Sequence, residues 1–210
     1  MKLLDVGAGD GGFLEITEDR LHKASWLNEY GGNYAYGIDV NPQYIEKAQR
    51  RIQNGTIFLV ADGRNIPFDD GEFDVIHEHG ALHHMSDYSK ALTEISRVMH
   101  EFSILILKES VDNDPFFSLC RRIVGNWNGD PVESFFTSNM LIGEMEKNFV
   151  ITSEEYYWRF PLSDLCCYWG LNELSISLRF NQWVSKMLKI MRLDQVFCSH
   201  LVLTAIKKVK

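Results

Sequence analysis

A glycine-rich turn near the start of the chain has residues suited to binding a nucleotide-like cofactor. Gly7, Gly9 and Gly12 follow the spacing G-x-G-x-x-G, with an apolar strand pattern before them and a helical pattern after them. Glycines let the backbone turn sharply and approach a ligand, and the following helix N-terminus favours phosphate-like groups. A loop that only packs a helix against a strand would show the same pattern, so the later residues must decide.

Carboxylates recur where the next predicted strands end. Asp39 ends a strand over 34–39, Asp62 follows one over 56–60, and Glu78 follows one over 73–77. Ligands of open parallel sheets bind at this edge. Asp39 is suited to accept hydrogen bonds from both hydroxyls of a ribose, and Asp62 from the exocyclic amine of an adenine. A structural Asp that caps a helix is the alternative at each position.

Histidines are concentrated just after the fourth predicted strand, at positions 77, 79, 83 and 84. We take His79 as the first candidate for a general base acting on a hydroxyl or an acidic carbon, and His83 as the second. The alternative is a structural role in the start of a helix. His79 and His83 have the i, i+4 spacing of zinc ligands, but further ligands are not evident, so we predict no metal site.

The composition is that of an ordinary globular protein. The chain has 210 residues, 45% of them hydrophobic, and a net charge of −8. Residues 1–110 carry 10 Lys/Arg and 18 Asp/Glu, whereas residues 111–210 carry 11 of each. An acidic half argues against nucleic acid and is compatible with a cationic ligand. With no apolar run of membrane-spanning length, no signal peptide and no C-x-x-C pair, we expect a cytoplasmic protein without an integral membrane segment.

Strand and helix patterns alternate along the chain and predict an α/β fold with a mostly parallel sheet. We expect strands over 2–6, 34–39, 56–60, 73–77, 103–108, 150–156 and 201–207, and helices over 13–27, 43–53, 88–99 and 137–148. The length is that of a single domain, 1–210. Its cofactor-binding half is 1–110, and its substrate-side half is 111–210.

Four ordered motifs resemble those of class I S-adenosylmethionine-dependent methyltransferases, of the broad ubiquinone/menaquinone-biosynthesis type (type 11). Asp5, Gly7 and Gly9 form D-x-G-x-G. The other motifs are the segments 37–42, 60–68 and 73–84. The resemblance implies a Rossmann-like doubly wound sheet of about seven strands with an antiparallel last strand. The family usually has a helix before its first strand, whereas this sequence starts directly at the strand, so we expect either a more open active site or a truncated start.

The resemblance also implies a cofactor, S-adenosyl-L-methionine, and the residues that bind it. Asp5, Gly7, Ala8 and Gly9 belong to the motif that lines the methionine moiety. Asp39 holds the ribose, Val40 lies against the adenine, and Asp62 and Gly63 meet the adenine edge. The backbone near Glu78 and His79 faces the amino-acid end. The acceptor is a small molecule or a lipid-linked molecule, and the sequence does not identify the acceptor atom.

Two alternative functions stay open on the sequence. The first is a nicotinamide-dependent oxidoreductase, but 32 positions separate Gly7 from Asp39, whereas the ribose-binding acid of such enzymes lies about 20 residues past the glycines. The second is a module that binds S-adenosylmethionine without catalysis.

The segment 161–198 interrupts the two final strands and is a candidate cap over the acceptor. Trp169, Phe180 and Trp183 are expected to form at least one wall of the acceptor pocket. Trp183, Met187 and Met191 recur at helical spacing. Such a stripe favours packing into the core, with a substrate cap or a surface that contacts lipid-linked acceptors as the alternatives.

Overall fold

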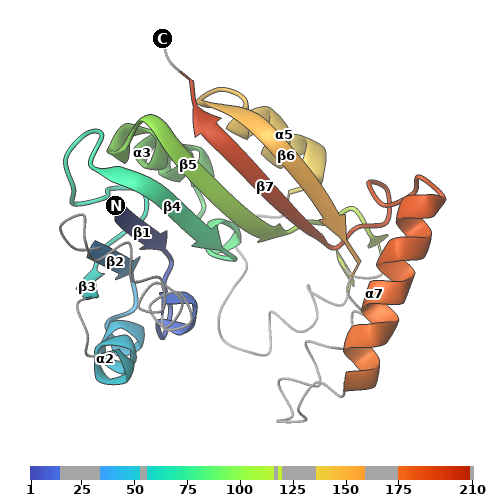
Figure 1. Ribbon diagram of the computed structural model, residues 1–210, viewed down its shortest axis with the longest axis horizontal. Helices are drawn as coiled ribbons and strands as arrows, with labels where there is room; N and C mark the ends of the chain where they lie inside the picture. The colour runs from blue at the N-terminus through green and yellow to red at the C-terminus, as the bar shows by residue number, and fades with distance from the viewer. Residues whose placement is uncertain (15–33, 53–55, 116–117, 120–135, 159–174, 209–210) are drawn as a thin grey trace.

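Seven strands form one sheet in the order β3-β2-β1-β4-β5-β7-β6 (Figure 1). The computed structural model describes residues 1–14, 34–52, 56–115, 118–119, 136–158 and 175–208. The strands are β1 Lys2–Val6, β2 Tyr34–Asp39, β3 Ile57–Val60, β4 Phe73–His79, β5 Met99–Ser110, β6 Phe149–Tyr157 and β7 His200–Lys207. β1 to β5 are parallel, and β7 is antiparallel to both β5 and β6. The predicted seven-stranded sheet with an antiparallel last strand is confirmed.

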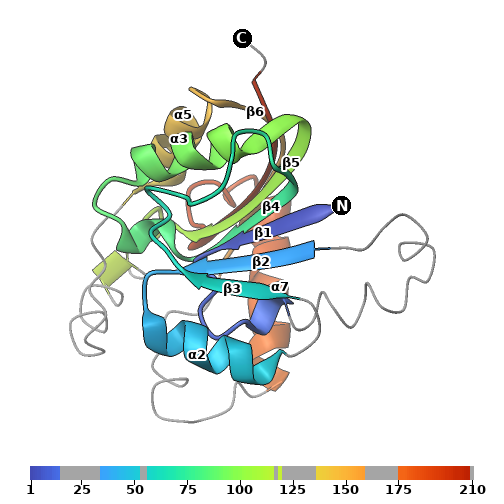
Figure 2. The ribbon, with the colours of Figure 1, turned by 90° about the vertical axis from the view of Figure 1, so that its left-hand side faces the viewer.

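Helices cover the two faces of the sheet. Figure 2 shows α2, Pro42–Arg51, on one face and α3, Tyr88–Val98, with α5, Ser138–Met145, on the other. α2 begins where expected, since the Asn41 side chain accepts a hydrogen bond from the Gln43 N–H and Pro42 occupies the first turn. A 3₁₀ turn, η2 Leu82–His84, precedes α3, and α7, Ser175–Ile190, precedes β7. Most of the helix predicted over 13–27 lies outside the described residues.

Two buried apolar clusters correspond to the two faces. Side chains of a strand point alternately to opposite faces. Leu4 and Val6 therefore join the larger cluster under α3 and α5, whereas Leu3 joins the smaller cluster under α2. Asp5 has the same parity as Leu3, and its side chain is buried although it is charged. The two clusters fix the strands whose carboxyl ends carry the polar residues identified above.

β2 approaches β3 and the first loop too closely for a side chain at Gly37. A Cβ built there would lie 2.6 Å from the Phe58 ring and 3.0 Å from the Ala8 Cβ. Gly37 therefore lets the Phe58 ring of β3 and the Ala8 side chain of the first loop come close to the backbone of β2.

We predict that Gly37→Ala lowers the free energy of unfolding by about 1–3 kcal/mol, because an overpacked core must displace Phe58 or Ala8. The matched control is Gly143→Ala. Gly143 is exposed in α5, and a Cβ there meets nothing within 4 Å, so this change should be neutral or should stabilise by up to about 1 kcal/mol. Urea unfolding measures both variants. Equal effects of the two substitutions would contradict the packing argument.

Candidate active site

A cleft of about 350 Å³ opens at the carboxyl ends of β1 to β4. Its walls come from the loops that follow these strands and from the start of α2. The lining residues are Gly7, Gly9, Ile38, Asp39, Val40, Asn41, Tyr44, Ala61, Asp62, Gly63, Arg64, Gly80, Ala81, His84 and Met85. The volume falls within the range of pockets that hold small ligands. The cleft is therefore the principal candidate for a cofactor site.

The glycine turn is held against the end of β2 by backbone and carboxylate hydrogen bonds. The N–H groups of Gly7 and Ala8 both donate to the Ile38 carbonyl, each at 2.9 Å. The Gly9 N–H donates to Asp39 Oδ2 at 3.0 Å, and the Asn41 N–H donates to Asp39 Oδ1 at 2.8 Å. Asp39 thus joins the first loop to the start of α2, and it also lines the cleft.

Two glycines of this turn serve different purposes. Gly7 has φ +76° and a Cβ there would lie 2.2 Å from the Ala81 Cβ, so the first loop and the loop after β4 are in direct contact. Gly9 has φ +54°, but a Cβ there would meet nothing within 4 Å. The left-handed backbone favours glycine at both positions. The open space over Gly9 leaves room for a ligand to approach the backbone.

Arg64 fixes the carboxylate of Asp62. Its Nη2 lies 2.8 Å from Asp62 Oδ2, its Nε lies 3.0 Å from Oδ1, and its backbone N–H also donates to Oδ1. Hydrogen bonding from Arg64 lowers the pKa of Asp62 below its ordinary value. The carboxylate therefore stays ionised and oriented at the wall of the cleft. Arg64 was not identified from the sequence, although its position two residues after Asp62 could have suggested this pairing.

Asp5 pairs with His77 instead of facing the cleft. Asp5 Oδ1 lies 2.7 Å from His77 Nδ1, and both side chains are buried. The Phe13 ring stacks on the His77 ring with centroids 3.4 Å apart. Burial raises the pKa of Asp5, and the hydrogen bond to His77 partly offsets this effect. Asp5 is therefore paired inside the fold and is not among the described residues that line the cleft.

Glu78 and Glu109 form a buried pair of acids under the turn that precedes α3. Glu78 Oε1 accepts hydrogen bonds from the N–H groups of Ala81 and Leu82 at 2.6 and 3.1 Å. Glu109 Oε1 accepts from the Leu82 N–H at 2.7 Å. Burial and the neighbouring Glu109 charge raise the pKa of Glu78 well above its ordinary value. Glu109 is equally buried, but the His83 hydrogen bond lowers its pKa. Of the two acids, Glu78 is therefore the one that keeps its proton to higher pH.

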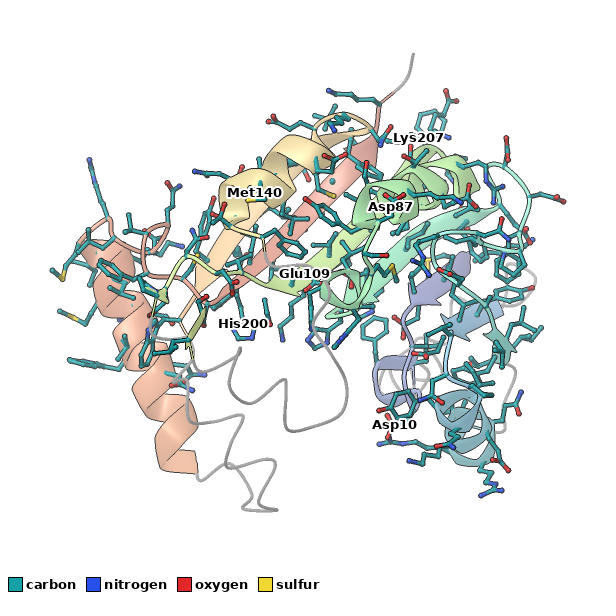
Figure 3. The ribbon with its side chains drawn as sticks, turned by 180° about the vertical axis from the view of Figure 1, so that it is seen from behind. Asp10, Asp87, Glu109, Met140, His200 and Lys207 are labelled. Carbon is teal, nitrogen blue, oxygen red and sulfur yellow. The ribbon has the colours of Figure 1, made fainter. Side chains whose placement is uncertain are left out.

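His83 is oriented by this acid pair. His83 Nδ1 lies 2.7 Å from Glu109 Oε2, and the His83 side chain is largely buried. An ionised carboxylate can only accept, so Nδ1 donates, and Nε2 is the ring nitrogen that this bond leaves for another partner. The ring lies beside Gly80, whose hypothetical Cβ would be 3.6 Å from His83 Cε1. Figure 3 shows Glu109 at the end of β5, beside His200 at the start of β7.

His79 has a different environment. Desolvation by its neighbours, and then the positive charge of Lys108, lower the pKa of His79 to about 4, although the residue is exposed overall. The ring is neutral at neutral pH and is a weaker base than an ordinary imidazole. Among the described residues that line the cleft, His84 is present, whereas His79 and His83 are not.

The residues expected to bind a cofactor divide into two groups. Six of them line the cleft, and these are Gly7, Gly9, Asp39, Val40, Asp62 and Gly63. Asp5, Ala8 and Glu78 are buried behind it. Tyr44 and Met85 also line the cleft and were missed, because an exposed helix position and a single methionine carry no distinctive sequence signal.

The candidate cap lies largely outside the described residues, including Trp169 and the Phe180 side chain. Trp183 is 59% exposed and is not among the cleft-lining residues of the described chain. The expectation that Trp183, Met187 and Met191 pack into the core is wrong, since all three are exposed. Helical spacing identified their shared face but not the side on which the helix packs.

Two further observations concern metals and membranes. Within the described ranges, no three His, Cys, Asp or Glu side chains come together as a metal site would require. None of the described helices is long and apolar enough to cross a bilayer.

Burial raises the pKa of Glu78 in the folded protein above the value of about 4.3 that it has when unfolded, so rising pH above that value favours unfolding. Glu78→Gln keeps the acceptor for Ala81 and cannot ionise. We predict that its stability relative to the unmodified protein increases between about pH 5 and about pH 7. Glu78→Ala removes the acceptor and should cost about 1–3 kcal/mol. Urea unfolding across this pH range tests both variants. A difference for Glu78→Gln that stays constant with pH would contradict the raised pKa of Glu78.

Comparisons with known proteins agree with this geometry. A family model described as a methyltransferase domain, type 11, matches residues 4–107. The phthiotriol/phenolphthiotriol dimycocerosates methyltransferase of Mycobacterium leprae is 33% identical over 99 residues, which cover 47% of this chain and 33% of that protein. The demethylmenaquinone methyltransferase of Thermotoga maritima is 30% identical over 108 residues, which cover 51% of this chain and 43% of that protein. The chain thus spans less than half the length of these two curated relatives.

The fold comparison extends over nearly the whole chain. The geranyl diphosphate C-methyltransferase of Streptomyces coelicolor, solved with Mg²⁺, geranyl diphosphate and S-adenosyl-L-homocysteine, superposes with a TM-score of 0.66. The match has 15% sequence identity and covers 99% of this chain and 72% of that protein. At this identity the match shows the fold alone. Strand order, glycine turn, cleft and family match together show that the chain belongs to the class I methyltransferases, with a type 11 methyltransferase domain.

Proposed function

We propose that this protein transfers a methyl group from S-adenosyl-L-methionine to a small-molecule acceptor. The observation that carries the proposal is the cleft at the strand ends, where the glycine turn and Asp39 meet. The cleft suits the cofactor because there is open space above the backbone at Gly9, and the carboxylate of Asp39 lies directly beside it. The bound cofactor would supply an electrophilic methyl group on a positively charged sulfur.

The cleft residues have distinct roles in this proposal. The N–H groups of Gly9 and Asn41 occupy one lone pair on each Asp39 oxygen. The remaining lone pairs accept hydrogen bonds from the ribose hydroxyls. Val40, which is exposed at the cleft wall, packs against the adenine. Asp62 and Gly63 meet the adenine edge, and the Asp62 carboxylate is held in place by Arg64. The backbone from Gly7 to Gly9 lies along the methionine moiety.

His83 is the better placed general base of the two candidates. Its Nδ1 is fixed by the buried Glu109, which leaves Nε2 able to take a proton from an acceptor hydroxyl or acidic carbon. Glu109 is a positioning residue, because it acts through His83. His79 remains a second candidate, but a pKa of about 4 makes it a poor proton acceptor at neutral pH.

The acceptor class that we propose is a lipid-linked molecule. The curated relatives are named as methyltransferases of phthiotriol and phenolphthiotriol dimycocerosates and of demethylmenaquinone. The relatives match this chain mainly in its cofactor-binding half, so their names guide the choice of test substrates and do not replace the test.

We predict that Asp39→Ala weakens binding of S-adenosyl-L-homocysteine by about 1–3 kcal/mol, because hydrogen bonds to a charged acceptor are lost. Asp10→Ala is the matched control, since Asp10 lies in the same turn but pairs with Arg51 at the surface. Isothermal titration calorimetry measures both affinities. If NADH bound more tightly than S-adenosyl-L-homocysteine, the result would instead favour a nicotinamide-dependent enzyme. Unchanged affinity in a folded Asp39→Ala variant would remove Asp39 from the site.

We further predict that methyl-labelled S-adenosylmethionine labels components of a lipid extract from cells. His83→Ala should lower the labelling rate by roughly 10²–10⁴-fold, the usual contribution of a positioned base, with little change in cofactor affinity. His79→Ala is the comparison variant and should have a smaller effect. Label that appears only in the aqueous extract would contradict the lipid-linked acceptor. Binding of the cofactor without labelling of either extract would indicate a catalytically silent module.

A further inference from the structure

Helix α7 presents a large apolar surface on its outer side. Ile190 is 67% exposed, Trp183 is 59% exposed, and Met187 is also exposed, and the three lie on one face at helical spacing. Met191, directly after the helix, continues this face and is 58% exposed. Figure 1 places α7 at the side of the molecule, and Figure 3 shows side chains that extend from it away from the sheet. We call Trp183, Met187, Ile190 and Met191 the outer patch.

The inner side of α7 is more polar than a packed helix usually is. Asn181 is buried there. Ser185 Oγ accepts a hydrogen bond from the Trp158 N–H at 3.0 Å and donates to the Trp158 carbonyl at 3.1 Å. Val184 and Leu188 are only half-buried beside them. Surface helices normally place their apolar stripe toward the core. Among the described side chains of α7, the apolar groups of Trp183, Met187 and Ile190 are instead exposed on the outer side.

Basic side chains border the outer patch. Lys186 and Lys189 are exposed along one edge of the helix, and Arg192 is exposed immediately after it. Over residues 181–199 the only acidic residue is Asp194, although the chain as a whole has a net charge of −8. The local charge is therefore opposite in sign to the overall charge. A partner that fits this surface is apolar at its centre and negatively charged around it.

An anionic lipid surface has these properties. Helices that lie in the membrane interface combine a Trp-containing apolar face with Lys and Arg beside it, and the ammonium groups attract anionic headgroups. Trp also favours the boundary between headgroups and acyl chains. A second copy of this chain fits less well, because a symmetric dimer through the outer patch would bring the same three basic residues against each other.

We propose that the outer patch of α7 binds the surface of an anionic lipid bilayer. Trp183, Met187 and Ile190 enter the interface between the headgroups, and Lys186 and Lys189 contact lipid phosphates. Attachment is peripheral. The inference goes beyond the proposed methyl transfer and does not depend on it, since the surface can bind lipid whether or not the cleft holds a cofactor.

Co-sedimentation with vesicles tests the proposal in the absence of any cofactor. The protein should sediment with vesicles of phosphatidylcholine mixed with phosphatidylglycerol, and much less with phosphatidylcholine alone. The double variant Lys186→Glu/Lys189→Glu should lower the partition coefficient for the mixed vesicles at least about tenfold. The double variant Trp183→Ser/Ile190→Ser should lower it comparably, because it removes the apolar contact.

Phe102→Ser is the matched control. Phe102 is 79% exposed near the start of β5, far along the sheet from α7, and its loss should leave vesicle binding unchanged. Circular dichroism melting confirms that each variant is folded. Absence of sedimentation, or an equal loss in the Phe102 variant, would overturn the proposal. A dimer in light scattering that the outer-patch variants dissociate, without vesicle binding, would overturn it in favour of self-association. A protein that failed to bind the cofactor should still bind vesicles, so the vesicle test is independent of the proposed function.

Discussion

The contact between the loops that follow β1 and β2 is the constraint on which the rest of the site depends. The Ile38 carbonyl accepts hydrogen bonds from two N–H groups of the glycine turn, and the Asp39 carboxylate accepts a third from the Gly9 N–H. Asp39 also accepts the Asn41 N–H at the start of α2. One carboxylate therefore shapes the turn, positions the helix and lines the cleft. A ligand that uses its remaining lone pairs meets a group that is already held in place, which reduces the cost of ordering it.

A second constraint comes from burying two acids behind the opposite wall of the cleft. Two ionised carboxylates in contact would repel each other strongly in a poorly hydrated interior. The protein resolves this by raising the pKa of Glu78 and lowering that of Glu109, with backbone N–H groups and His83 as partners. The same arrangement closes the turn before α3 and orients the His83 ring. Folding and the proposed proton transfer thus depend on one hydrogen-bonded network.

The sequence predicted the sheet and the cleft-lining glycines because strand periodicity and turn chemistry are local properties. It could not predict which way each strand-end acid points. Asp5 and Glu78 occupy the expected positions, but Asp5 faces His77 on the α2 side, and Glu78 turns under the Ala81 backbone. The pairing of Arg64 with Asp62 was missed, although their two-residue spacing could have suggested it. For α7, spacing defined the apolar face, but only tertiary packing determined that this face points outward.

A crystal structure of the protein with bound S-adenosyl-L-homocysteine tests the central claim most directly. The account predicts the nucleoside in the cleft, with both ribose hydroxyls within hydrogen-bonding distance of Asp39 and the adenine between Val40 and Gly63. Asp39 should keep its hydrogen bonds to Gly9 and Asn41. A ligand bound elsewhere, or a ribose that leaves Asp39 with only its two backbone donors, would contradict the account.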